Sequence, residues 1–286
     1  MLLTFILLGL SICAVWIPNV ALGRGFSVPP WALLFATAIA SGFVYGVLRW
    51  PALIALTLLI SASVLSQHLN GRVSRTVFTV IAALIALALA LHLVPGFNNP
   101  TVVDGVRVTE AASPFTQYAN FDKGAAGLVL LVFFCQRVTS IEEWRRIAAP
   151  TLLAIGLTAS AVIASALVAG YVAFDPKLPP FVLTFLAINL LFTCVAEESF
   201  FRGLLQERLA RVLAPRWQWT AIAVSSVLFG LAHFAGGMLY VFLAAIAGLG
   251  YALVYSATRR IESAVLTHFA VNAIHFFGFT YPHLAR

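Results

Sequence analysis

Charge is the property that this sequence has least of. Lys, Arg, Asp and Glu make up 9% of its 286 residues, and hydrophobic residues make up 62%. An ordinary soluble domain is roughly 25% charged. A chain with so few charges cannot cover a water-facing surface, so the composition excludes an ordinary soluble protein. Apolar runs of about 20 residues, the length that crosses a bilayer core, recur along the whole chain instead.

Cysteine is also scarce, and its distribution excludes two further classes. Cys13, Cys135 and Cys194 are the only cysteines, and each lies inside an apolar segment. Their spacing matches neither a cysteine-rich zinc site nor a disulfide scaffold. We therefore expect them to be small, unreactive core residues.

Ten apolar segments predict the fold class, which is all-α: a polytopic transmembrane helical bundle of eight to ten spans. Segment 120–136 is short and 51–69 carries several serines, which is why the lower number stays open. The segments are 2–22, 29–48, 51–69, 76–95, 120–136, 148–171, 180–202, 217–235, 238–258 and 261–279.

The net charge of +7 could indicate a nucleic-acid partner, but the basic residues are concentrated in alternate loops, as in a membrane protein with a fixed orientation. With ten spans, the odd loops hold Arg24, Arg72, Arg75, Arg137, Arg145, Arg146, Arg208, Arg211, Arg216, Arg259 and Arg260. The even loops and the tails hold fewer: Arg49, Arg107, Lys123, Lys177 and Arg286. The positive-inside rule therefore places the odd loops in the cytoplasm and both termini outside. We expect the lipid bilayer as a partner, and no nucleic acid.

The polar residues divide the chain. The longest polar segment, 96–123, is predicted to be an external loop, either a solvated surface loop or a cap over a cavity. Charged and polar motifs inside apolar spans occur only in the last hundred residues. We therefore predict an N-terminal transmembrane scaffold at 1–171 and a catalytic helical core at 178–279.

Two adjacent carboxylates and an arginine end the seventh apolar segment. Glu198 and Arg202 are four residues apart, so on a helix they share a face suited to an ion pair. Glu197 is turned roughly 100° away from Glu198 and can act separately. Ionisable groups within the membrane are costly and predict a functional site. By contrast, we expect the pair Glu142 and Glu143, near two arginines, to be a solvated charge cluster in a loop.

The next span carries Phe229 and His233. The midpoint between Glu197 and His233 is residue 215, a proline in a turn-like stretch. If the two spans are antiparallel helices joined there, both residues lie ~24 Å from the turn and on the same level. The carboxylate and the imidazole could then meet within the bundle.

The last span carries His268 and Asn272, again four apart on one helical face. Together they could donate two hydrogen bonds to one developing oxyanion. His268 lies only ~13 Å from the preceding turn, so a straight-helix count places it at a different depth from Glu197.

Taken in order, these three motifs resemble the CPBP family, which includes type II CAAX prenyl endopeptidases and bacteriocin-processing or immunity proteins. The resemblance covers roughly residues 178–279 and consists of Glu-Glu-x-x-x-Arg, Phe-x-x-x-His and His-x-x-x-Asn. It implies an intramembrane endopeptidase that hydrolyses a peptide or a membrane-protein segment.

The resemblance also implies a role for each motif residue. Glu197 and His233 would activate a water molecule, and His268 and Asn272 would stabilise the tetrahedral oxyanion. Glu198 and Arg202 would support them, and Phe229 would pack beside them. We predict a glutamate protease with no metal. Two histidines and two glutamates could still ligate zinc, although the residue four from each histidine, Phe229 or Asn272, is a poor zinc ligand.

Two other functions stay open at this point. A catalytically silent family member could act as a membrane scaffold or regulator. A transporter or proton relay also uses intramembrane glutamates and histidines, but the sequence shows no repeated halves with broken helices. We expect an integral protein of a bacterial inner membrane, with the substrate undefined.

Overall fold

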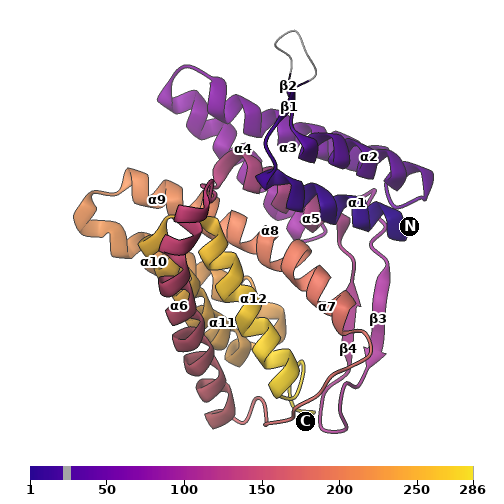
Figure 1. The fold of residues 1–286 in the computed structure, drawn as a ribbon, viewed down its shortest axis with the longest axis vertical. Coiled ribbons are helices and arrows are strands. Elements are labelled where there is room, and N and C mark those ends of the chain that lie inside the picture. The colour runs from indigo at the N-terminus through magenta and orange to yellow at the C-terminus, as the bar shows by residue number, and fades with distance from the viewer. Residues whose placement is uncertain (22–26, 286) are drawn as a thin grey trace. The chain divides into compact units, whose positions relative to one another are not determined.

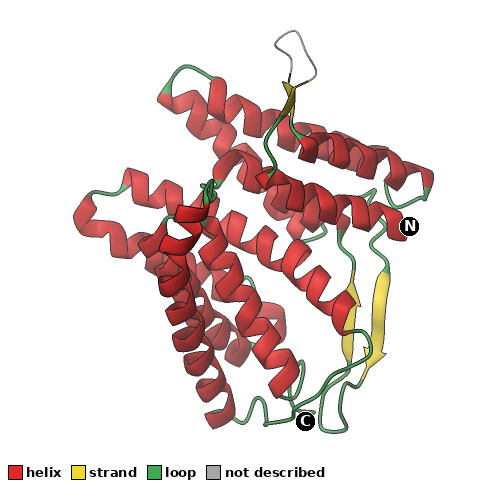
Figure 2. Ribbon diagram, viewed as in Figure 1, coloured by secondary structure: helices red, strands yellow, loops and turns green. Residues whose placement is uncertain are grey.

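The computed structural model describes residues 1–21 and 27–285, and within them each of the ten apolar segments folds as a helix (Figures 1 and 2). Arg24 and Arg286, which entered the charge count, lie outside the described residues. The helices are α1 (Leu2–Cys13), α2 (Pro30–Val44), α3 (Trp50–His68), α4 (Arg72–Ala90), α5 (Phe121–Phe134), α6 (Ile141–Val168), the compound helix 182–212, α10 (Gln218–Leu231), α11 (Met238–Thr258) and α12 (Ile261–Gly278).

Helix length and hydropathy confirm an all-α membrane bundle. Five helices of the described chain are long and apolar enough to cross a bilayer: α3, α4, α6, the compound helix and α11. Three shorter apolar helices accompany them, at Leu2–Trp16, Pro30–Val44 and Gln218–Leu231. Two short sheets also form, which the sequence analysis did not predict. They join β1 (Val20–Ala21) to β2 (Ser27–Val28) and β3 (Thr101–Val106) to β4 (Phe115–Tyr118).

The compound helix 182–212 is the element that carries the acidic motif. It consists of α7 (Val182–Ile188), α8 (Val195–Glu198) and α9 (Glu207–Val212), joined by π-helical turns at Asn189–Cys194 and Ser199–Gln206. It continues to Val212, ten residues beyond the predicted apolar segment 180–202. π-helical turns are rare and often lie at functional sites.

The expectation that Glu142 and Glu143 lie in a loop is wrong, because α6 begins earlier than the apolar segment. Both residues lie in its first helical turn. The Ser140 side chain caps the helix by accepting a hydrogen bond from the Glu143 backbone N–H. A carboxylate in the first turn is favoured by the helix dipole, which explains why the helix extends beyond the apolar run.

The long polar segment 96–123 contains an ordered hairpin, although most residues of its first strand, β3, are exposed to solvent. Its residues 101–106 and 115–118 form the β3–β4 sheet. Phe115 packs on Phe185 and Phe276, whose rings stack with centroids 3.7 Å apart. The hydroxyl of Ser113 lies 3.1 Å from Nδ1 of His283, so the hairpin tip is also tied to the C-terminal segment.

The chain divides into two compact units that interleave along the sequence. Unit 1 is Met1–Pro100, Tyr118–Cys135 and Leu191–Phe200, and unit 2 is Thr101–Gln117, Gln136–Leu190 and Phe201–Arg286. This division follows backbone packing, whereas the predicted boundary between 1–171 and 178–279 follows the motifs. The motif-based domain assignment stays a prediction.

Two glycines allow α5 to pack closely against the compound helix within unit 1. A Cβ atom at Gly127 would lie 2.7 Å from the Cα of Ala196, and one at Gly124 would lie 2.9 Å from the Phe192 ring. Real Cβ atoms do not approach a neighbouring backbone that closely. Small residues at helix interfaces let membrane helices pack against each other, because burial from lipid provides little driving force of its own.

The start of α5 is held by a buried carboxylate. Asp122 is almost fully buried and accepts hydrogen bonds from the Asn99 side chain at 2.9 Å and the Lys123 backbone N–H at 2.8 Å. Nδ1 of His92 lies 2.7 Å from the same carboxylate. The polar residues of this region therefore fix where α5 begins.

The cysteines follow the prediction in part. Cys194 is fully buried and Cys135 is partly buried, but Cys13 is exposed on the surface of α1. None of the three takes part in a disulfide within the described residues.

We expect Gly127→Ala to destabilise the protein and Gly156→Ala to leave its stability unchanged or raised. Both glycines lie inside helices, so each substitution gains about 1 kcal/mol of helix propensity. A Cβ at Gly156 meets no atom within 4 Å, whereas at Gly127 it meets the backbone of Ala196. Apparent melting temperatures in detergent test this, and equal melting temperatures for the two variants would contradict the close packing.

Candidate active site

The two adjacent glutamates of the acidic motif lie on α8, between the π-helical turns. Glu198 is fully buried, while the Glu197 side chain keeps 14% of its surface exposed. The different exposure follows from the roughly 100° between successive helical residues. The two carboxylates therefore have different surroundings, although they are neighbours in sequence.

A lysine from α5 holds the Glu197 carboxylate. Nζ of Lys123 lies 2.6 Å from Oε1 of Glu197, and only 18% of the lysine side chain is exposed. Both residues belong to unit 1. The sequence analysis placed Lys123 in an external loop, which is wrong, because it lies in the first turn of α5. A charge-assisted hydrogen bond of this length orients the carboxylate and stabilises its negative charge.

The arginine of the acidic motif is fully buried in unit 2. Its guanidinium donates to the Ser225 hydroxyl and to the Gly248 carbonyl, each at 3.0 Å. The same group lies over the Phe229 ring, 5.0 Å from the centroid. Arg202 thereby connects the compound helix to α10 and α11 through polar contacts and a cation–π contact.

Phe229 is the point where the second and third motifs meet. Its ring lies 4.8 Å from the His233 ring and 5.6 Å from the His268 ring, measured between centroids. Phe229 is itself buried, with 2% of its surface exposed. Together with Arg202, these residues form one cluster within unit 2, contributed by three different parts of the chain.

His233 lies in the turn after α10, not within the span as the sequence predicted. α10 ends at Leu231, and a short 3₁₀ turn, Phe234–Gly236, follows. Nδ1 of His233 lies 2.8 Å from the Phe229 carbonyl oxygen. Because a carbonyl can only accept, Nδ1 must carry the proton. The neutral imidazole then has its lone pair on Nε2, the atom able to accept a proton.

The third motif projects from α12. His268 is buried and stacks on Tyr251, with centroids 4.6 Å apart. The Asn272 carboxamide donates to Oδ1 of Asn189 at 3.2 Å, which orients it. Asn189 lies in the first π-helical turn of the compound helix, so the two helices are connected at this level.

The structure thus brings the predicted residues together in two groups. Glu197 and Glu198 lie in unit 1 with Lys123, while Arg202, Phe229, His233 and His268 converge in unit 2, with Asn272 further along α12. The predicted pairing of Glu197 with His233, and that of Glu198 with Arg202, stay predictions.

The prediction of a site without metal also stays a prediction. Across residues 1–21 and 27–285, no group of three or more His, Cys, Asp or Glu side chains is arranged to hold a metal ion. The hydrogen bond of His233 to a backbone carbonyl would suit a metal ligand as well as a general base, because it fixes the tautomer in both cases.

Three residues of the site were missed by sequence reasoning: Lys123, Asn189 and Tyr251. Each is a single polar or aromatic residue within or next to an apolar segment. A lone Asn or Lys at such a position is costly and marks a partnered residue. That signal identifies the residue but not its partner.

We expect Arg202→Lys to destabilise the protein, because an ammonium cannot replace the planar fork that reaches both Ser225 and Gly248. Losing one buried hydrogen bond to a charged group costs about 1.5–3 kcal/mol in free energy of unfolding. Arg211→Lys is the control, because Arg211 is 52% exposed and pairs with Glu207 on the surface side. A small effect in both variants would contradict the assigned role of Arg202.

Comparison with known proteins supports the interpretation of the motifs. Residues 178–274 match the family model described as Rce1-like, type II CAAX prenyl endopeptidase. No curated protein and no solved structure matches the chain. The matched segment contains the acidic motif, both histidines and Asn272, in the order that the family resemblance requires. Residues 178–274 therefore form a domain of the CPBP family, in its type II CAAX prenyl endopeptidase-like group.

Proposed function

We propose that this chain is an intramembrane endopeptidase that uses Glu197 and His233 to activate water. The observation that carries the proposal is the convergence of His233, His268 and Arg202 on the Phe229 ring, within the matched domain. The grouping favours catalysis, because a scaffold alone does not require two histidines, one from α12 and one from the turn after α10, beside one buried aromatic ring. The proposed substrate is a peptide or a membrane-protein segment at the bilayer, prenylated or not.

The proposed reaction is a hydrolysis in which the protein moves one proton. Water attacks the carbonyl carbon of the scissile bond while Glu197, assisted by Nε2 of His233, accepts a proton from it. The resulting oxyanion receives hydrogen bonds from His268 and Asn272. The C–N bond then breaks, the stored proton passes to the leaving amine, and a carboxylic acid and an amine are released. The acid then loses its remaining proton to water, which leaves a carboxylate.

Asn272 suits this role because its carboxamide has two N–H donors. One reaches Asn189 and fixes the plane of the amide. We assign to the same carboxamide a hydrogen bond to the oxyanion. His268 is held in a comparable way, because the stacked Tyr251 ring restricts rotation of the imidazole.

Lys123 is proposed as a positioning residue for Glu197. It lies outside the matched segment, so the N-terminal half would contribute to the site as well as scaffold it. The ammonium holds the carboxylate in one orientation and stabilises its charge in surroundings with little water. A misplacement of about 1 Å in a catalytic group can lower the rate by about 10²-fold.

We further propose that the reaction uses no metal and that the protein resides in the cytoplasmic membrane of a bacterium, with the turn near residues 213–217 in the cytoplasm. The excess of basic residues in the odd loops supports this orientation.

We expect Glu197→Gln to abolish proteolysis without unfolding the protein, because the amide keeps the shape of the side chain and loses the proton acceptor. Membrane proteomes of cells that express either the wild type or the variant should differ in uncleaved peptides or protein tails. Glu142→Gln is the matched control, since Glu142 is an exposed acid in the first turn of α6.

Identical proteomes for the wild type and Glu197→Gln would overturn the protease assignment and favour a silent regulator. Loss of activity with a chelator, restored by zinc in proportion to bound metal, would overturn only the metal-free mechanism. Glu197, His233 and His268 would then be ligands.

We expect Lys123→Met to lower the turnover of a substrate found in that comparison by about 10²-fold, with Lys123→Arg retaining part of the activity. In a double-mutant cycle with Glu197→Gln, the melting temperatures should show a coupling of about 0.5–3 kcal/mol. If the two residues are coupled in stability but Lys123→Met does not lower turnover, the ion pair is a structural contact and Lys123 is not a positioning residue. The absence of both would contradict the positioning role.

A further inference from the structure

A second polar site lies in unit 2, where α6 begins and α11 ends. A cavity of about 370 Å³ opens there to the surface. Three of its seven lining residues are arginines and none is acidic: Arg146, Ile147, Pro150, Ala257, Thr258, Arg259 and Arg260. None of these residues belongs to the proposed catalytic motifs.

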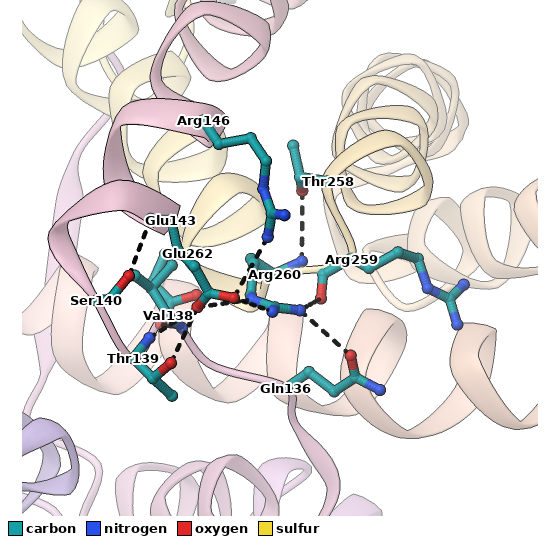
Figure 3. Close-up of polar contacts among 10 residues, drawn as sticks. All are labelled: Gln136, Val138, Thr139, Ser140, Glu143, Arg146, Thr258, Arg259, Arg260 and Glu262. Atoms are coloured by element: carbon teal, nitrogen blue, oxygen red, sulfur yellow. Dashed lines mark hydrogen bonds and ion pairs between the residues drawn. The ribbon is translucent and has the colours of Figure 1, made fainter.

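The acidic partners of these arginines do not line the cavity. Arg146 and Arg260 both bind Glu143, as Figure 3 shows. The Glu143 side chain is 19% exposed, whereas that of Arg146 is 66% exposed. Arg146 is therefore more exposed than the carboxylate that it binds, whereas Arg260 and Glu143 are equally exposed, at 19% each. The charged groups that line the cavity are all positive.

Arg259 also lines the cavity and is likewise more exposed than the carboxylate that it binds. In Figure 3 its side chain extends away from Glu143. It pairs with Glu207, whose side chain is only 3% exposed, while 38% of the Arg259 side chain is exposed. Glu207 also binds Arg211. Four guanidinium groups thus pair with two carboxylates, and neither carboxylate lines the cavity, so the charge at the cavity wall is positive.

The residues around the cavity are of the kinds expected at the depth of the lipid headgroups. Below it, α6 continues as a membrane span with exposed Leu152, Leu153 and Leu157. Trp144, in the first turn of α6, is 39% exposed. Exposed tryptophans are enriched at membrane–water interfaces, where the ring bridges the apolar and polar layers. An acyl chain could therefore lie along the leucines while its headgroup enters the cavity.

We propose that this cavity binds the phosphate headgroup of an anionic phospholipid. Guanidinium groups match the oxygens of a phosphate with paired hydrogen bonds, and basic pockets between membrane helices bind anionic headgroups on the cytoplasmic side. The predicted orientation places this end of α6 in the cytoplasm, where anionic lipids concentrate. The proposal concerns lipid binding and stands independently of the proposed peptidase activity.

The test measures how much phosphatidylglycerol the full-length, detergent-purified protein retains in native mass spectrometry. Arg146→Gln should lower the retention about fivefold, since one basic residue near the membrane surface contributes about that factor. Arg145→Gln is the matched control: Arg145 is its exposed neighbour, carries the same charge and does not line the cavity. Arg146→Lys, which keeps the charge and loses the fork, should fall between the two.

Two further arms identify the source of the phosphate. Phosphatidylcholine, whose headgroup carries a phosphate but no net charge, should bind less and respond little to Arg146→Gln. Displacement of phosphatidylglycerol by an equal concentration of inorganic phosphate would assign the cavity to a free anion and overturn the lipid proposal. An equal loss of binding in Arg145→Gln and Arg146→Gln would also overturn it, because it would show only general attraction of charge.

Discussion

The buried guanidinium of Arg202 is the interaction on which the arrangement of unit 2 depends. A charge without water must find its partners inside the protein, and Arg202 finds them on two other helices, at Ser225 and Gly248. The aromatic ring that it covers, Phe229, also contacts His233 and His268. Because Arg202 needs these partners, its position also fixes the Phe229 ring, which both histidines contact.

The arrangement of unit 1 depends on close contact between the backbones of α5 and the compound helix, in addition to charge. Gly124 and Gly127 remove side-chain bulk from α5, so the backbone of Ala196 can approach. That approach brings Lys123 within hydrogen-bond distance of Glu197. A glutamate that seemed available for catalysis thereby gains a partner from outside the matched family domain.

Local rules predicted the elements well and their ends less well. Apolar runs located all ten helices, but α6 begins before its apolar run because Ser140 caps it, and α10 ends before His233. The equal-depth argument for Glu197 and His233 assumed a regular helix on both sides of the turn. Two π-helical turns and the early end of α10 alter that geometry, and neither feature has a signal in hydropathy.

The sequence by itself determined the membrane class, the helical architecture, the family and the residue types of the site. It could do so because bilayer thickness fixes the length of apolar runs and because charged residues within them are costly. Only the tertiary structure decided which groups meet. Lys123 and Glu197 are 74 residues apart, and Asn189 and Asn272 are 83 apart. Helical periodicity relates residues within one turn or two, whereas contacts between helices depend on packing, which no local pattern encodes.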